Sequence, residues 1–436
     1  MTRKRIVIVG GGAGGLELAS GLGRDLGGFE REKSEAEIVL VDANATHLWK
    51  PLLHQVAAGT MNSYQDELSY LAQGRSSGFR FQYGRMDGLQ PAERRVTLAA
   101  LIDDDGETLL PPRDLSYDLL VLAVGSVGND FGTPGVQEFC HFIDSRAQAE
   151  QFHRDFLIAL ARRSLTEDDT PLSVVIVGGG ATGVELAAEL RHATDIAEEY
   201  GLSGSARRLN VTIVEQADRL LGGLSEKVAT ETHKALTDIG IDIRIGQGVS
   251  KVEAQSVTLE DGTVLPATLS VWSAGMQAPP FLKDLPGLTF GQGGRIKVGP
   301  ALQAEGQPDI FALGDCALFI DPKTDKPLGA RAQVAHQQAS FLRKALAAKL
   351  RGQPLPDFRF REHGTLISLS RFEAFGSLGD GRKKGHTAFI NGLAAKLAYR
   401  MLHRSHQYAV MGLLGTAAQM ATDLLRRANH AQVKFH

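Results

Sequence analysis

Short runs of aliphatic and β-branched residues alternate with helix-like segments along most of the chain. The pattern is clearest in two stretches, IVIVGGGAGGLELA at residues 6–19 and VVIVGGGATGVELA at residues 174–187. Each begins with four apolar residues, passes through a glycine loop and continues as a helix-forming run, and the two agree at 11 of 14 positions. Strands that alternate with helices predict parallel sheets covered by helices, so the expected fold class is α/β.

The repeat extends beyond the glycine loops. Residues 116–126 (SYDLLVLAVGS) and 267–276 (ATLSVWSAGM) each predict a buried strand that runs into a glycine turn. Each follows a segment with an Asp-Gly hairpin signal, DDDGETLL in the first copy and LEDGTVL in the second. A strand at 309–315 and a long helix at 331–350 come later, and residues 166–171 (TEDDTP) are typical of a linker. We therefore expect a whole half-domain to occur twice.

Composition narrows the class of protein. The chain has 436 residues, 43% of them hydrophobic and 22% charged, with a net charge of −3, so a non-specific role on nucleic acid has no support. Its two cysteines, Cys140 and Cys316, exclude a disulfide scaffold, a four-cysteine iron–sulfur site and a CxxC redox pair. The N-terminal apolar run is too short for a signal peptide, and no stretch reaches the ~20 apolar residues that cross a bilayer. We expect a reducing compartment and a chain that is not threaded through a membrane, although it can lie on one.

Both glycine loops have the spacing G-x-G-x-x-G between a strand and a helix. The first glycine permits a tight turn, the second lets backbone approach a pyrophosphate, and the third lets the helix pack close to the sheet. The helix N-terminus adds partial positive charge. The six glycines are Gly10, Gly12, Gly15, Gly178, Gly180 and Gly183. The alternative, two α/β turns that bind nothing, is weakened because the strand and helix context is present twice.

An acid at the end of the next strand is the second part of such a site, because it accepts hydrogen bonds from a ribose. Asp42 in AEIVLVDAN and Glu215 in LNVTIVEQAD take this place. The chain is therefore expected to bind two dinucleotides in two Rossmann-like domains, one as bound flavin and one as exchangeable nicotinamide. The loops alone leave open which is which. Glu215 favours NADH over NADPH because a carboxylate repels a 2′-phosphate, while Arg219 nearby argues in the other direction.

With these motifs in place, the chain resembles the two-dinucleotide flavoprotein disulfide-reductase superfamily. Three further strings are similar to the type II NADH:quinone oxidoreductases, which are single-subunit enzymes that do not pump protons. They are HLWKPLLHQVAAG at 47–59, GDCA at 314–317 and RAQVAHQQ at 331–338. The resemblance covers essentially the whole chain.

The resemblance implies a role for each motif. Tightly bound, non-covalent FAD would be held by the first loop with Asp42, Lys50, Pro51, Gly125, Gly314 and Asp315. NADH would be held by the second loop with Glu215, Ala274 and Gly275. Gln333 and Gln337 would face a quinone, and Glu189 would handle protons. The implied domains are 1–165 with 286–385 for FAD, 166–285 for NADH, and 386–436 for membrane association.

Plainer interpretations of these side chains exist. Gln333 and Gln337 share a helix face and can equally cap carbonyls in the core. Glu185 and Glu189 are also four residues apart, and without the resemblance a solvated helix face is their simpler explanation. His336 is more often an ordinary hydrogen-bonded histidine, and Cys316 a packing residue. No histidine and carboxylate spacing suggests a metal site.

From residue 382 onward the chain becomes basic. Nine positive charges accompany a single acid, Asp423. The positive residues are Arg382, Lys383, Lys384, Lys396, Arg400, Arg404, Arg426, Arg427 and Lys434. The spacing between 396 and 409 predicts an amphipathic helix, with Lys396, Arg400, His403, Arg404 and Gln407 on one face and Ala398, Leu402, Tyr408 and Ala409 toward the other. Such a helix is typical of a membrane surface, and the alternative is a helix packed on its own domain or in a dimer.

Together these observations predict a peripheral membrane flavoenzyme that oxidises NADH and reduces quinone without proton pumping. We expect a homodimer, no nucleic-acid partner, and a place on the cytoplasmic face of the bacterial inner membrane. Two rivals stay open. One is a soluble NADH:acceptor flavin reductase, and the other is a flavin-binding interaction protein that responds to NADH.

Overall fold

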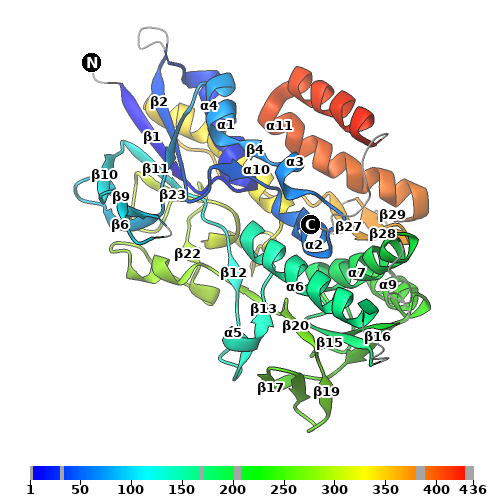
Figure 1. Ribbon diagram of the computed structural model, residues 1–436. Helices are drawn as coiled ribbons and strands as arrows, with labels where there is room; N and C mark the ends of the chain where they lie inside the picture. Colours follow the sequence, from blue (N-terminus) through cyan, green and yellow to red (C-terminus); the bar gives the residue numbers. More distant parts are fainter. Residues whose placement is uncertain are drawn as a thin grey trace.

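The computed structural model describes residues 3–29, 34–103, 105–165, 170–200, 208–379 and 388–427. Two five-stranded parallel sheets organise these residues (Figure 1). The first sheet has the order β23-β11-β1-β2-β5, with every neighbouring pair parallel. Its strands are β23 (Ile310–Ala312), β11 (Leu119–Leu122), β1 (Lys4–Val9), β2 (Ala36–Asp42) and β5 (Arg80–Tyr83).

The second sheet repeats this arrangement with the order β13-β20-β14-β15-β16, again parallel throughout. Its strands are β13 (Cys140–His141), β20 (Leu269–Trp272), β14 (Leu172–Val177), β15 (Leu209–Glu215) and β16 (Ile241–Ile245). In each sheet the strand before the glycine loop lies at the centre and its last four residues are buried, which explains the continuous apolar run before the loop. The expected α/β fold class and the internal duplication are both confirmed.

An antiparallel three-stranded sheet follows in each copy. The first is β6 (Met86–Gln90), β7 (Arg95–Leu98) and β10 (Arg113–Ser116); the second is β17 (Val249–Glu253), β18 (Ser256–Leu259) and β19 (Val264–Pro266). The Asp-Gly signals fall where hairpins occur. Gly106 (φ 85°) connects β8 (Leu101–Ile102) to β9 (Thr108–Leu110), and Gly262 (φ 86°) connects β18 to β19.

Helices cover the two parallel sheets, and short elements link them. The longer helices are α1 (Ala13–Leu26), α6 (Arg146–Leu165), α7 (Ala181–Glu199), α9 (Glu226–Asp238) and α10 (Ala332–Leu350). The short helices are η1 (Lys50–Leu52), α2 (Leu53–Ala58), α3 (Ser63–Asp66), α4 (Tyr70–Ser77), α5 (Val136–Phe139), η2 (Pro280–Asp284), η3 (Gln292–Gly294) and η4 (Gly314–Cys316). The short strand pairs are β3 (Thr46–His47) with β4 (Leu68–Ser69), β12 (Val127–Gly128) with β21 (Met276–Gln277), β22 (Ile296–Lys297) with β24 (Ala317–Leu318), and β25 (Ile320–Asp321) with β26 (Lys326–Pro327).

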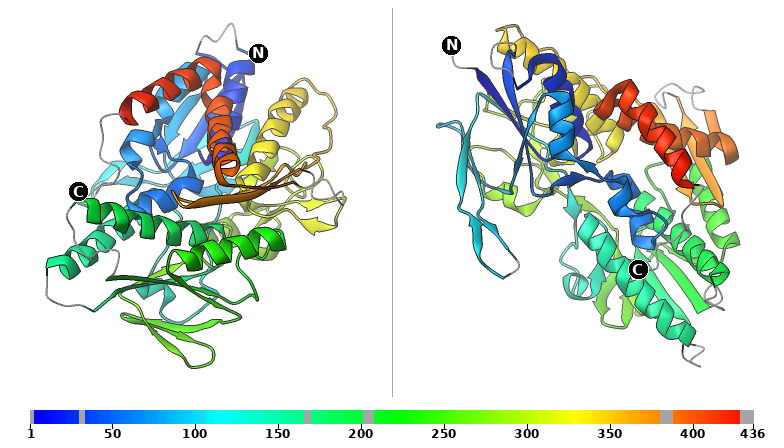
Figure 2. Two further views of the ribbon diagram at one scale, coloured as in Figure 1. Left: turned by 90° about the vertical axis from the view of Figure 1, so that its right-hand side faces the viewer. Right: turned by 45° about the horizontal axis from the view of Figure 1, so that its top comes forward.

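After α10, the described residues form a third antiparallel three-stranded sheet and a long helix. The sheet consists of β27 (Gly364–Leu369), β28 (Glu373–Leu378) and β29 (Ala388–Asn391), all antiparallel. The helix α11 (Gly392–Arg427) breaks at Gly412, where φ is 74°, and its second arm folds back beside the first (Figures 1 and 2). An ion pair of 2.6 Å between Arg404 and Asp423 joins the arms. No helix among these described residues is long and apolar enough to cross a membrane.

The sequence predicts a domain boundary at residue 165, and β13 and α6 lie just before it. β13 pairs with β20 of the second sheet, and α6 contributes Phe152 and Phe156 to the core beneath that sheet. β13 therefore belongs to the second sheet, whereas α6 packs between both copies, since its core also includes Val56 of α2. Of the basic residues in the tail, Arg382, Lys383, Lys384 and Lys434 lie outside the described residues, as do residues 166–169 of the expected linker.

Candidate dinucleotide and proton site

The first glycine loop connects β1 to α1, and each of its glycines has a different environment. Gly10 has φ 105°, and a Cβ there would collide with the carbonyl oxygen of Ala123. A Cβ on Gly15 would collide with the carbonyl oxygen of Gly10. Around Gly12, by contrast, no atom of the described residues lies within 4 Å of the Cβ position. Packing explains the first and third glycines, and the second leaves open space at the N-terminus of α1.

The second loop repeats these relations at β14 and α7. Gly178 has φ 113°, and its Cβ would lie 2.7 Å from the backbone nitrogen of Ala274. A Cβ on Gly183 would meet the carbonyl oxygen of Gly178, whereas the space at Gly180 is again open to 4 Å within the described chain. Each helix N-terminus thus offers backbone N–H groups and a place that a side chain would fill. This geometry suits a phosphate group.

Both predicted acids turn toward their glycine loops. Oδ2 of Asp42 accepts a hydrogen bond of 2.6 Å from the backbone N–H of Gly11, and Oε2 of Glu215 accepts one of 2.6 Å from that of Gly179. The acids are thereby fixed at the carboxyl ends of β2 and β15, where they retain lone pairs for ribose hydroxyls. Arg219 donates to the carbonyl oxygen of Gly222 at 3.1 Å, so its guanidinium helps to shape its own turn.

The residues assigned to the flavin ring by resemblance also meet in space. Nζ of Lys50 donates to the carbonyl of Ser126 at 2.9 Å, and Oγ of Ser126 donates to Oδ2 of Asp315 at 2.8 Å. Gly125 and Gly314, both with φ 72°, form the turns that bring Ser126 and Asp315 together. Pro51 lies in the first turn of η1, directly after Lys50.

Two further residues of this cluster, Asp144 and Gln338, are not predicted by the sequence motifs. Asp144 lies 3.6 Å from Lys50, and Gln338 accepts a hydrogen bond of 2.7 Å from the backbone N–H of Gly314. Gln338 is fully buried and closes the string RAQVAHQQ, so its position in that string was the available signal.

The two glutamines of α10 are bound to the backbone of residues 361–364. Gln333 accepts from the N–H of His363 at 2.9 Å and donates to the carbonyl of Gly364 at 3.0 Å. Gln337 accepts from the N–H of Arg361 at 2.9 Å and donates to its carbonyl at 2.7 Å. In this conformation both amides tie the strand-leading segment to α10, as the capping interpretation describes.

Glu185 and Glu189 are buried, so the solvated helix face is wrong for both. Glu189 accepts hydrogen bonds from Thr60 at 2.8 Å and from Ser370 at 3.0 Å, and it lies 3.7 Å from His192. Thr60 and Ser370 come from segments after α2 and β27, far from α7 in the sequence, whereas His192 lies three residues along α7 itself. Helical spacing alone could therefore not place the two hydroxyls.

The two carboxyls differ in their pKa. Burial raises the pKa of Glu185 to about 8, assisted by the charge of Glu189 and opposed by a hydrogen bond of 3.0 Å from the N–H of Ser368. Burial also acts on Glu189, but hydrogen bonds and nearby histidines outweigh it and lower its pKa. His54, three residues after Pro51, is buried, and burial lowers its pKa; its Nε2 has no hydrogen-bond partner among the described residues. A protonated and an ionised carboxyl therefore lie four residues apart on α7 near neutral pH, and Nδ1 of His54 lies 3.5 Å from Oε2 of Glu185.

The remaining candidates are simpler. Burial raises the pKa of the Cys316 thiol to about 12, and its sulfur lies 3.3 Å from the carbonyl of Leu313, so it is a packing residue and not a nucleophile at neutral pH. No group of three or more metal-ligating side chains is found within the described ranges.

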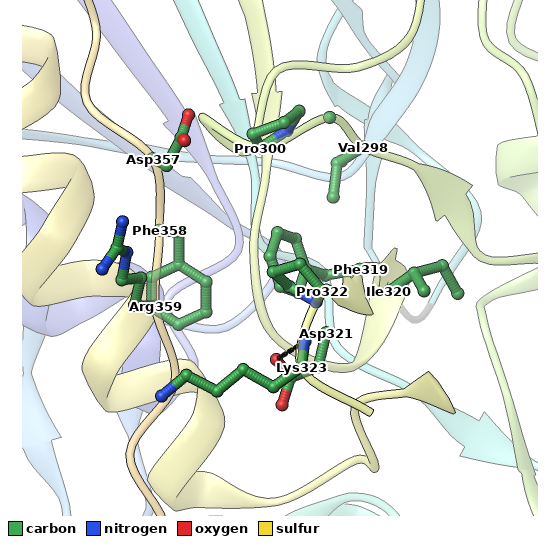
Figure 3. A pocket seen from close by; sticks show the side chains of 11 residues that line it. Val298, Pro300, Phe319, Ile320, Asp321, Pro322, Lys323, Asp357, Phe358 and Arg359 are labelled. Carbon is green, nitrogen blue, oxygen red and sulfur yellow. Dashed lines mark hydrogen bonds between the residues drawn. The ribbon is translucent and has the colours of Figure 1, made fainter. Parts of the chain in front are cut away.

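A separate cavity of about 480 Å³ opens beside β25 (Figure 3). Phe319 and Phe358 form its apolar wall, and Lys323 and Arg359 lie on one side of it. Its lining shares no residue with the two glycine loops or their acids.

Comparison with known proteins agrees with this geometry. Residues 4–339 match the family model described as pyridine nucleotide-disulphide oxidoreductase. The chain is 38% identical to the type II NADH:quinone oxidoreductase of Haemophilus influenzae, over 99% of this chain and 100% of that protein. It is 28% identical to the enzyme of the same name from Staphylococcus aureus, over 87% and 90% of the two chains.

Solved structures share the fold. NDH2 from Plasmodium falciparum in complex with NADH superposes with a TM-score of 0.83 at 16% identity, covering 100% of both chains. The sulfide:quinone oxidoreductase of Aquifex aeolicus gives 0.73 at 17% identity, covering 94% of this chain and 91% of that one. The chain therefore belongs to the pyridine nucleotide-disulphide oxidoreductase family and, within it, to the type II NADH:quinone oxidoreductases.

Proposed function

We propose that the protein oxidises NADH and reduces quinone through a bound FAD, without pumping protons. The observation that carries this proposal is the pair of equivalent phosphate cradles, each with its own acid, in a chain that aligns over its full length with a type II NADH:quinone oxidoreductase. FAD, when bound, supplies the two-electron chemistry that links a nicotinamide to a quinone.

The residues of the first loop fit FAD. The open space at Gly12 admits a pyrophosphate, and Asp42 is placed for an adenosine ribose. The cluster of Lys50, Ser126 and Asp315 would hold the flavin end, with Pro51 beside the ring. This assignment follows the resemblance, which places FAD at the first loop and not at the second.

The second loop would hold NADH. Glu215 accepts from a 2′-hydroxyl and repels a 2′-phosphate, and Arg219 is already bonded to backbone carbonyls. The turn at Ala274–Gly275 lies against Gly178 and would position the nicotinamide end. We propose a clear preference for NADH over NADPH.

Quinone reduction consumes two protons, and the buried carboxyls can deliver them. Glu185 holds a proton near neutral pH, and Glu189 is ionised and hydrogen-bonded to two hydroxyls. We propose that Glu189 relays protons to the quinone side and that Glu185 keeps a proton in reserve next to it. Gln333 and Gln337 would contact the quinone, with the segment 361–364 adjusting to release their amides.

The outer surface of α11 suits a membrane. Its exposed large apolar residues are Leu393, Leu397, Met401, Leu402, Tyr408, Leu413, Leu414 and Met420. Lys396 donates to the carbonyl of Arg371 and Arg404 pairs with Asp423, so these two cations serve the protein rather than lipid. We propose that insertion of the apolar residues, more than charge, holds the enzyme peripherally on the cytoplasmic face of the membrane. The alternative is that this apolar surface forms the interface of a homodimer.

The test is anaerobic spectroscopy on the purified holoprotein. NADH should bleach the flavin absorbance, and a quinone analogue should restore it rapidly. Absence of flavin absorbance, or of its bleaching by NADH, would contradict the proposed oxidation of NADH through FAD. A long-lived reduced complex that quinone does not reoxidise would favour the NADH-responsive switch. Rapid turnover with failure to bind vesicles would favour the soluble reductase.

A further inference from the structure

Both backbone polar groups of Gly11, inside the first glycine loop, are hydrogen-bonded to side chains. Its N–H donates to Asp42, and its carbonyl accepts from the hydroxyl of Tyr70 at 2.8 Å and from Nδ1 of His47 at 2.9 Å. Both lone pairs of this carbonyl are therefore used. Nε2 of His47 lies 3.0 Å from Nε2 of His406, which belongs to α11, 359 residues away along the chain.

The contacts continue from His406 into the protein. Nδ1 of His406 lies 2.6 Å from Oε1 of Glu17 on α1, and Oε2 of Glu17 lies 2.6 Å from Nδ1 of His336 on α10. Glu17, His47 and His406 are all less than 8% exposed. Four separate elements thus meet in one line of hydrogen bonds that ends at the phosphate loop.

Donor and acceptor rules fix the protons along this line. The carbonyl of Gly11 can only accept, so Nδ1 of His47 must carry a hydrogen. Burial lowers the pKa of His47 to about 3, so the ring is neutral and its Nε2 must accept. His406 therefore donates from Nε2 to His47 and from Nδ1 to the carboxylate of Glu17.

His406 also borders the segment that leads to Lys50. The ring of Trp49 stacks on His403 with centroids 5.0 Å apart and on His406 at 5.7 Å, with interplanar angles of 8° and 15°. The first arm of α11 thus contacts both the phosphate loop, through His47, and the chain that carries Lys50.

The second loop provides an internal contrast. The carbonyl of Gly179, the counterpart of Gly11, accepts from the backbone N–H of Leu221 at 2.8 Å, within its own domain. Glu185, the counterpart of Glu17 at an offset of 168, is hydrogen-bonded to Tyr399 of α11. Tyr399 and His406 are seven residues apart on one face of the helix, but only His406 connects onward to a glycine loop.

We propose that His406 is a positioning residue for the dinucleotide of the first loop, so that tight flavin retention requires the first arm of α11 to be docked. This proposal rests on the assignment of FAD to that loop. The membrane-facing helix would then secure the resident cofactor and leave the nicotinamide loop independent of it.

The test separates hydrogen bonding from packing with three variants of the full-length protein. In H406Q, an amide that donates to His47 turns its oxygen against the carboxylate of Glu17, so two acceptors face each other. In H406Q/E17Q, the amide introduced at position 17 donates to the amide oxygen introduced at position 406, and every donor again meets an acceptor. In E17Q, a neutral His406 still donates to His47 and accepts from the new amide at position 17. The matched control is S405Q, at an exposed position next to His406 on the same helix.

The readout is FAD affinity, measured by reconstitution of apoprotein and flavin fluorescence, alongside the Kd for NADH. We expect H406Q to bind FAD about tenfold more weakly or worse, as for the loss of a charged hydrogen bond. E17Q, the double variant and S405Q should lie within about threefold of wild type, and the Kd for NADH should not change in any of them.

Equal loss of FAD affinity in H406Q and H406Q/E17Q would overturn the proposal, because a packing role does not depend on residue 17. If H406Q does not fold, the double variant decides alone, and its failure to fold or to bind FAD also overturns the proposal. Weakened NADH binding with unchanged FAD binding would show that the loops are assigned the wrong way round. A wild-type protein that binds no FAD would instead refute the proposed function.

Discussion

Alanine at the middle glycine of the second loop should separate ligand binding from folding. Gly180 has φ −74° and ψ −178°, a conformation that any residue adopts, and its Cβ would meet no described atom within 4 Å. Removing backbone freedom from the unfolded chain stabilises by about 0.4–1 kcal/mol, and losing glycine at a helix N-cap offsets a similar amount. The free energy of unfolding of G180A should therefore lie within about 1 kcal/mol of wild type.

Ligand binding should respond very differently. The methyl group would occupy the space through which a phosphate reaches the backbone N–H groups of α7. Loss of one charged hydrogen bond is worth about 1.5–3 kcal/mol, which is about 10- to 150-fold in Kd. G180A should weaken NADH by that factor and leave FAD in place, whereas G12A should weaken FAD and spare NADH.

The matched control is the third glycine of the same loop. A Cβ on Gly183 would collide with the carbonyl oxygen of Gly178, so G183A should destabilise the fold by about 1–3 kcal/mol or more. Urea unfolding of the apoprotein gives stability, and anaerobic titration monitored by protein fluorescence gives Kd. A G180A protein of normal stability that binds NADH as tightly as wild type would refute the assignment of this loop.

Three further predictions concern the rest of the molecule. The pKa of Glu185 is raised from 4.5 to about 8, so between these pH values the carboxyl ionises only in the unfolded chain. The free energy of unfolding should therefore fall by up to about 5 kcal/mol as pH rises from 4.5 to 8. E185Q should remove this loss, and equal urea midpoints for E185Q and wild type at pH 9 would contradict the prediction. L413E/L414E, at positions 72% and 86% exposed, should abolish sedimentation with vesicles while NADH still bleaches the flavin; retained sedimentation would exclude this surface. Q337L removes two hydrogen bonds to Arg361 and should cost about 1–2 kcal/mol of stability, and it should raise the KM for quinone but not for NADH; an unchanged KM for quinone would leave Gln337 a purely structural residue.

Local sequence was enough to find the dinucleotide loops. Backbone sterics and strand order fix the parts of this motif, which are a strand, three glycines, a helix and an acid on the next strand. All of these parts lie within about 40 consecutive residues. Gly10, Gly15 and Asp42 therefore occupy the places that their spacing predicted. The glutamines of α10 were found on one face, but which partner they choose depends on the segment 361–364, which the spacing does not reveal.

The buried carboxyls could not be placed in this way. Glu17 and Glu185 occupy equivalent positions in the two repeats, one turn into the helix after each glycine loop, where solvent is the default expectation for an acid. They are buried because distant elements supply partners, His406 and His336 for the first and the N–H of Ser368 for the second. Such partners are separated by more than 180 residues, so no window along the sequence contains both.

The helix α11 shows why this matters for its exposed apolar surface. Helical spacing separates its polar from its apolar positions but does not say which side turns inward. In most globular helices the apolar side does. Here Val410 is buried, but Lys396 and His406 also bind groups of the body, while Leu402 and Tyr408 are exposed. The reason is the repeat beneath it. Each copy presents a buried carboxyl on the helix after its loop, and Tyr399 and His406, about 10 Å apart along α11, each bind one of them. Tyr399 and His406 turn inward to these carboxyls, while Leu397, Met401 and Tyr408 are exposed, where a lipid surface or a second subunit can cover them.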